Sequence, residues 1–113
     1  MSKDAAFADF IKELPKAALG LAEVTGYLLA GPKGQTVFFD LPAGASVPLH
    51  SHGAQWGIVV SGEMELTIGD ETKIYRAGEC YDIPAGALHG ATVLVPSLVI
   101  DVFAEPNRYS PQG

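Results

Sequence analysis

Three histidines are the residues of this 113-residue chain whose types and spacing are best suited to chemistry. His50 and His52 lie two residues apart, so in an extended segment both imidazoles point to the same side. His89 follows the turn at residues 84–86, and a strand that begins there brings a third imidazole to the same point if the sheet closes with the two segments opposite each other. Neutral imidazoles are ligands of zinc, nickel, copper and iron, so the pattern predicts a site for one divalent transition metal ion.

The segments around the histidines have the pattern of short β-strands. Runs of five to seven residues rich in Val, Ile, Leu, Phe, Tyr and Thr alternate with turns, which thirteen glycines and eight prolines supply. In 63–68 the alternation is strict, so Met64, Leu66 and Ile68 are expected to face the core. The sequence therefore predicts an all-β, antiparallel sandwich or barrel. Its predicted strands are 24–30, 35–41, 55–60, 63–68, 72–76, 79–83 and 97–103.

The amino-terminal segment has a different period. Its apolar residues recur at helical spacing, at Phe7, Phe10, Ile11 and Leu14. Asp4 is a suitable N-cap and Pro15 ends the pattern, so we expect one short amphipathic helix over about residues 4–14. A helix this short is marginal by itself in water, and its predicted role is to cover a sheet edge or a partner subunit. The alternative is a frayed tail.

Two spaced motifs around the histidines resemble those of the cupins. The first reads Gly44-x5-His50-x-His52-x2-Gln55-x6-Gly62, and the second reads Gly78-x5-Pro84-x-Gly86-x2-His89-x3-Val93. Both motifs in the right order, with a short stretch between them, make a specific signal rather than an isolated match. The resemblance implies an antiparallel double-stranded β-helix, the jelly-roll or cupin barrel, as a single domain over residues 1–113.

The cupin resemblance also implies a set of metal ligands: His50, His52, His89 and a fourth, acidic position. In this chain the acidic position appears as Gln55, one residue early, and Val93 replaces the terminal asparagine of the second motif. We therefore expect Gln55 to bind the ion through its amide oxygen. The alternative is that Gln55 supports one of the ligands through a hydrogen bond or only lines the pocket. The expected ion is divalent zinc, nickel, iron or manganese.

A neutral amide in place of a carboxylate has consequences for the chemistry. One negative charge fewer beside the ion makes it a stronger Lewis acid and disfavours its higher oxidation state. This favours an isomerase or lyase that polarises an oxygen of a small organic or sugar-like substrate over a metal-dependent dioxygenase. Cupins with a glutamine near this position include sugar and uronate enzymes. An anionic sugar acid needs a convergent cation, however, and Lys73, Arg76 and Arg108 have no predicted place inside, so a neutral or weakly polar ligand is expected.

The remaining candidate residues each have two interpretations. Trp56, Tyr27 and Tyr81 are candidates to line a ligand pocket, and the alternative is that they are ordinary core aromatics. Cys80 is expected to be a small buried residue without a catalytic role. No general acid or base is evident beside the predicted ligands, so a non-catalytic module that binds or senses a small molecule is the alternative to an enzyme.

Composition and charge limit the partners. With 48% hydrophobic and 18% charged residues the chain is expected to fold, and a net charge of −6 without a basic cluster argues against nucleic acid as a partner. No apolar run approaches the roughly 20 residues of a membrane-spanning helix. The single cysteine and the lack of an apolar leader favour a reducing, cytoplasmic setting. Exposed strand edges and the terminal helix predict a homodimer.

Overall fold

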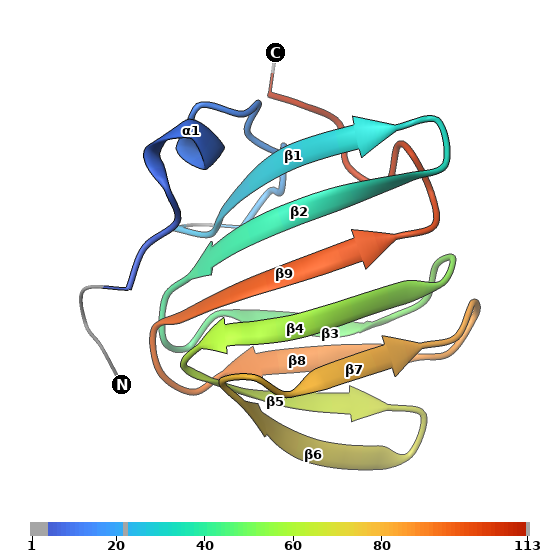
Figure 1. The fold of residues 1–113 in the computed structure, drawn as a ribbon. Coiled ribbons are helices and arrows are strands. Elements are labelled where there is room, and N and C mark those ends of the chain that lie inside the picture. Colours follow the sequence, from blue (N-terminus) through green and yellow to red (C-terminus); the bar gives the residue numbers. More distant parts are fainter. Residues whose placement is uncertain (1–4, 22, 113) are drawn as a thin grey trace.

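The computed structural model describes residues 5–21 and 23–112, which form one short helix and nine strands (Figure 1). Within these residues, no helix is long and apolar enough to cross a membrane. The helix α1 covers Asp9–Lys12. The strands are β1 (Thr25–Gly31), β2 (Gly34–Leu41), β3 (Ser46–His50), β4 (Gln55–Ser61), β5 (Glu63–Ile68), β6 (Glu71–Arg76), β7 (Cys80–Ile83), β8 (His89–Val93) and β9 (Ser97–Phe103).

The strands form two antiparallel sheets that lie face to face. The first sheet has the order β1-β2-β9-β4-β7 and the second has the order β3-β8-β5-β6. The chain crosses repeatedly between them, since β3, β5 and β8 are each followed or preceded by a strand of the other sheet (Figure 1). Two antiparallel sheets connected in this way are a jelly-roll barrel. The predicted all-β jelly roll with one short amino-terminal helix is therefore confirmed.

Alternation along each strand separates an inner face from an outer one. In β4, for example, Gln55, Gly57 and Val59 are buried between the sheets, whereas Trp56 and Val60 are exposed on the outer side. The inner faces of both sheets contribute the main core cluster. Its largest fully buried side chains are Phe103, Ile83, Val37, Val59 and Val99.

Two strands, β3 and β8, are absent from the predicted set, although they carry two of the three histidines. β3 has four exposed residues and contains Pro48, which cannot donate to a ladder and is tolerated because β3 is an edge strand. In β8, a Cβ on Gly90 would approach the Val47 carbonyl oxygen to 2.8 Å, so a glycine lets the two strands lie close together. Neither strand has the apolar alternation on which the other seven predictions rest.

The amino-terminal helix is shorter than expected. It has four residues instead of the predicted span of about 4–14, and the proposed N-cap Asp4 lies outside the described residues. Phe7 packs with Tyr27 and its neighbours against the outer side of the first sheet, whereas Phe10 of the helix is 75% exposed. The helical segment therefore covers part of a sheet face, and residues 15–17 directly after it pair with the edge strand β1.

Candidate metal centre

The three histidines converge from two strands and one loop. His50 is the last residue of β3 and pairs in register with His89, the first residue of β8. His52 lies in the loop between β3 and β4. The ligand nitrogens of the three rings lie within 4.8 Å of one another, and the ring centroids are 4.3, 4.6 and 5.1 Å apart. The structure therefore brings together the three imidazoles that the spacing singled out.

Each imidazole is held in one tautomer by the backbone. The Nδ1 atoms of the three rings lie 2.8–3.0 Å from carbonyl oxygens of nearby residues. A carbonyl oxygen only accepts hydrogen bonds, so Nδ1 donates and Nε2 carries the lone pair of the neutral ring. This arrangement orients the rings and leaves the three Nε2 atoms available to an ion. The carbonyl acceptors belong to Pro48 for His50, Gly53 for His52 and Ala87 for His89.

The Nε2 atoms of His52 and His89 face each other at 3.0 Å. Two lone pairs directed at this gap repel unless a proton or a metal cation lies between them. Burial lowers the pKa of both imidazoles, and the hydrogen bonds to backbone carbonyls oppose this shift. The neighbouring histidines and the positive charge of Arg108 lower the pKa values further. The neutral, ligand-competent form is therefore favoured, and the donor set fits a divalent transition metal.

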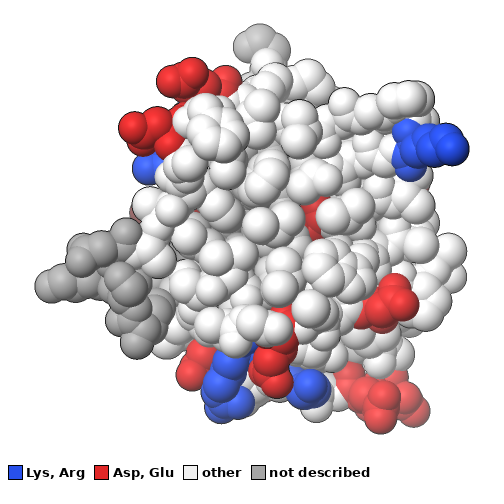
Figure 2. Space-filling view, in the orientation of Figure 1, with Lys and Arg blue, Asp and Glu red and all other residues white. Residues whose placement is uncertain are grey.

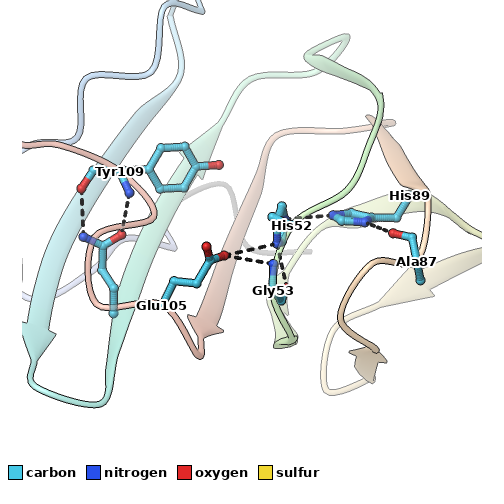
Figure 3. A network of polar contacts seen from close by, with 7 residues as sticks. His52, Gly53, Ala87, His89, Glu105 and Tyr109 are labelled. Carbon is cyan, nitrogen blue, oxygen red and sulfur yellow. Dashed lines mark hydrogen bonds and ion pairs between the residues drawn. The ribbon is translucent and has the colours of Figure 1, made fainter.

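A carboxylate beyond β9 anchors the loop that carries His52. Glu105 Oε1 accepts a hydrogen bond of 2.9 Å from the Gly53 backbone N–H and lies 3.9 Å from His52 Nδ1. Figure 3 shows this carboxylate on one side of His52 and the His89 ring on the other. Because Glu105 and Gly53 are 52 residues apart in the sequence, no local motif indicates their contact.

The histidines border a cavity of about 640 Å³ between the two sheets. This volume is typical of sites for small molecules, and most of the wall is apolar. The few polar side chains that share the cavity with the histidines include Gln55, Tyr81, Asp101 and Arg108. A ligand in this cavity would therefore contact a few polar side chains in a largely apolar environment.

Gln55 faces this cavity from the first residue of β4. Its side chain is 8% exposed, and its Oε1 is buried without a hydrogen-bond partner among the described residues. The amide also hydrogen-bonds Asp101 and lowers the pKa of that carboxyl group, which assigns the donating NH₂ to Asp101. A buried amide oxygen without a donor is costly, and this oxygen is free to bind a cation or to accept a hydrogen bond from a ligand hydroxyl.

Tyr81 and Asp101 form a buried pair across β4. The Tyr81 hydroxyl donates a hydrogen bond of 2.5 Å to Asp101 Oδ1, and Gly57 lies between them as the register partner of both. A Cβ on Gly57 would overlap both the carboxylate and the tyrosine ring, so only glycine leaves room for this bond. Burial raises the pKa of Asp101 to about 6, against the opposing hydrogen bonds from Tyr81 and Gln55, and burial also raises the pKa of Tyr81 well above its usual value.

Arg108 supplies the cation that the sequence could not place. Its side chain lines the cavity, and its guanidinium carbon lies 4.4 Å from the centroid of the Tyr109 ring. The buried Nε has no hydrogen-bond partner among the described residues. The expectation that no convergent cation accompanies the histidines is therefore wrong, because the segment after β9 folds back over the cavity.

The three aromatic residues expected to line the pocket lie in different places in the structure. Tyr81 lines the cavity, as expected. Trp56 does not, because it follows Gln55 by one residue and points to the outer face of β4, where it is 43% exposed. Tyr27 is also absent from the wall and packs in the outer cluster with Phe7. Cys80, expected to be buried, is exposed on the same outer side.

Comparison with protein families agrees with this fold and site. The family model of the cupin domain matches residues 37–103. This segment contains both histidine motifs and eight of the nine described strands in whole or in part. The chain therefore belongs to the cupin family.

Several solved structures share this fold. KdgF from Halomonas sp. is 28% identical, with 92% of this chain and 94% of that chain covered and a TM-score of 0.76. An RmlC-like cupin from Shewanella frigidimarina NCIMB 400 is 24% identical, with 95% and 94% covered and a TM-score of 0.77. Oxalate decarboxylase from Bacillus subtilis is 19% identical, with 85% of this chain and 28% of that chain covered and a TM-score of 0.72. The last two likenesses concern the fold.

One curated protein matches a shorter part of the chain. Mannose-1-phosphate guanylyltransferase 2 from Escherichia coli O157:H7 is 41% identical over 46 residues. The match covers 41% of this chain and 10% of that protein. This chain therefore corresponds to a small part of that relative, and the match adds no information about the reaction.

Proposed function

We propose that this cupin is a metal-dependent enzyme of the isomerase or lyase type that acts on a small, oxygen-rich substrate bearing a carboxylate. The observation that supports it most is the arrangement of His50, His52 and His89, whose Nδ1 atoms donate to carbonyls while their Nε2 atoms converge. Gln55 is the proposed fourth ligand, because its buried Oε1 has no protein donor. When bound, a divalent transition metal supplies Lewis-acid polarisation of a carbonyl or hydroxyl oxygen.

The proposed proton-transfer group is the pair formed by Tyr81 and Asp101. Both side chains line the cavity, and the carboxyl group has a pKa near 6, so both its protonation states are accessible close to neutral pH. Acids with pKa values raised by burial in a cavity cluster at catalytic sites. The pair therefore favours an enzyme over a sensor, and favours proton transfer over oxygen activation by a dioxygenase.

The proposed substrate class follows from Arg108. A guanidinium group in the wall of an apolar cavity, with a buried Nε that has no hydrogen-bond partner among the described residues, is suited to a carboxylate, which it can bind through charge-assisted hydrogen bonds. The proposed substrate is therefore an anion such as a uronic acid, in place of the neutral ligand expected from the sequence. Similarity to KdgF over nearly the whole of both chains is compatible with a shared site architecture.

The metal part of the proposal is tested by elemental analysis of protein purified without chelators or a metal column. We expect close to one transition metal ion per chain in the wild type, and loss of most of it in His50→Ala. Gln55→Ala should bind the ion more weakly, whereas Thr92→Ala, an exposed change on β8, should match the wild type. Unchanged metal content and affinity in Gln55→Ala would exclude that residue as a ligand.

The substrate part is tested by titrating the metal-loaded protein with galacturonate and with galactose, which lacks the carboxylate. A charge-assisted hydrogen bond corresponds to about a tenfold or greater preference in affinity for the acid, and Arg108→Met should remove this preference without weakening the binding of galactose.

The reaction is tested by proton NMR of a panel of uronic acids in D₂O, which reports hydrogen exchange at the carbon beside the carbonyl. We expect exchange with the wild type and none with Asp101→Asn; binding without any reaction in the wild type would favour the sensing module.

A further inference from the structure

Gln35 of β2 holds the backbone of one residue that is distant in the sequence. Its side chain is 3% exposed and lies on the inner face of the strand, with Val37 and Phe39. The amide Nε2 donates a hydrogen bond of 2.9 Å to the Tyr109 carbonyl, and Oε1 accepts one of 3.0 Å from the Tyr109 N–H (Figure 3). Gln35 therefore satisfies both backbone groups of Tyr109, as a neighbouring strand would.

The segment that contains Tyr109, residues 105–109, depends on Gln35 for its path over the cavity. It has neither helix nor strand, and among the described residues its backbone makes no hydrogen bond to the rest of the protein other than those to Gln35. Backbone hydrogen bonds hold the chain on both sides of this segment, between Ala104 and Ala54 and between Ser110 and Ala18.

The cation of the cavity, Arg108, lies against the ring of the residue that Gln35 holds. Its guanidinium carbon is 4.4 Å from the centroid of the Tyr109 ring and 5.8 Å from that of the Phe103 ring. The Tyr109 ring packs edge-to-face on Phe39 and Phe103, at centroid distances of 6.1 and 5.7 Å. The place of this ring therefore limits where the guanidinium group can lie.

Arg108 differs in its surroundings from the charged residues of the surface. On the face shown in Figure 2, most charged side chains lie near the rim, where water solvates them. Arg108 instead lines the cavity, and its Nε is buried. Gln35 does not line this cavity, so it acts on a ligand only through the segment that it holds.

We propose that Gln35 is a positioning residue, which holds the backbone of Tyr109 so that the guanidinium group of Arg108 lines the cavity. This role rests on the proposed function, in which Arg108 binds the carboxylate of the substrate. A mobile arginine loses conformational entropy when it binds an anion, and a guanidinium group that is already in place loses less. Gln35 therefore contributes to the preference for anionic over neutral substrates, although it touches no substrate.

Hydrogen exchange measured by NMR tests the positioning without any substrate. Gln35→Met has a similar length but no amide, so the Tyr109 N–H should exchange at least about tenfold faster than in the wild type, while the amides of β9 keep their protection. Gln35→Ala, which removes the same bonds without overpacking, should behave alike. Thr36→Val, on the opposite face of β2, is the matched control and should leave the Tyr109 N–H unchanged. Wild-type protection of Tyr109 in both Gln35 variants would overturn the proposal.

Ligand preference tests the consequence for the site. The metal-loaded wild type should bind galacturonate about tenfold or more tightly than galactose, and Gln35→Met should lose most of this preference. Its affinity for galactose and its metal content should stay at the wild-type values. A purely structural role would weaken both ligands alike, and that result, or an unchanged preference, would contradict the positioning role.

Failure of the proposed substrate has a different signature. A wild type that does not distinguish galacturonate from galactose would overturn the proposed substrate class. Exchange of the Tyr109 N–H in the Gln35 variants would still decide whether Gln35 positions residues 105–109, because that measurement needs neither metal nor ligand.

Discussion

At the scale of single residues, Asp101 should make the stability of the fold depend on pH. Its pKa is raised from 3.8 to about 6 by burial, so the folded state disfavours the ionised form. Below pH 4 the group is protonated in both states, and above pH 6 the folded protein carries an unfavourable buried charge. The free energy of unfolding should therefore fall as pH rises through this window, by about 3 kcal/mol from this residue.

Asp101→Asn isolates this effect, because the histidines also titrate nearby. The variant keeps an acceptor for Tyr81 but has no ionisable group, so its stability relative to the wild type should increase between pH 4 and pH 7. Urea denaturation of both proteins across this range, with metal removed by a chelator, is the measurement. Parallel pH profiles of the two proteins would show that ionisation of buried Asp101 does not destabilise the fold.

Glu105 should control metal affinity without being a ligand. It accepts the Gly53 N–H and so fixes the loop in which His52 lies. Glu105→Ala should weaken metal binding about 10- to 100-fold, as is typical when a group that orients a ligand is lost. Glu105→Gln should recover part of the affinity, since its amide oxygen can still accept. Competition with a metal indicator measures this, and Glu65→Ala, an exposed glutamate elsewhere, is the control that should have no effect.

The residue scale also shows where sequence reasoning succeeds. The predicted proximity of His50 and His52 is confirmed, although only His50 lies in a strand and His52 lies in the loop that follows it. The position of Arg108 depends on how the segment after β9 returns over the cavity, and the contact between Glu105 and Gly53 spans 52 residues. Such contacts depend on tertiary folding and leave no periodic signal in the sequence.

At the scale of strands, Gly57 of β4 makes room for a contact between the side chains of β7 and β9. Its missing side chain lets Tyr81 reach Asp101 across β4, so Gly57→Ala should destabilise the fold by about 1–3 kcal/mol through overpacking and loss of the hydrogen bond. Gly31→Ala on β1 is the matched control, because a Cβ there meets nothing within 4 Å. Urea denaturation compares the two, and similar small effects at both positions would mean that the pair tolerates a side chain.

Strand prediction from the sequence depends on exposure. β5 alternates apolar and polar residues, and the structure confirms that Met64 and Leu66 are buried while Glu65 is exposed. β3 lies at a sheet edge with four exposed residues, so it has no buried face to produce alternation. The strands that hold the histidines are thus the least visible in the sequence, although the histidines themselves are the most informative residues.

At the scale of the whole molecule, the two terminal segments meet beside the cavity. Ala17 forms a bridge with Pro111, and the Ala18 N–H donates to the Ser110 carbonyl at 2.8 Å. Ala18 and Ser110 also line the cavity. The site is therefore closed by residues from both ends of the described chain, which explains why the central motifs alone do not define the chemistry of the cavity.

The proposed metal ion should also hold the barrel together. His50 and His89 belong to the second sheet and His52 to the loop that enters the first, so one ion would cross-link segments that separate on unfolding. Metal at 100 times its dissociation constant stabilises the folded state by about 2.7 kcal/mol, which corresponds to roughly 10 °C in Tm for a domain of this size. Thermal unfolding at constant protein concentration should show this increase, and a chelator should reverse it. His50→Ala should show no increase, and an equal response from that variant would place the stabilising ion elsewhere.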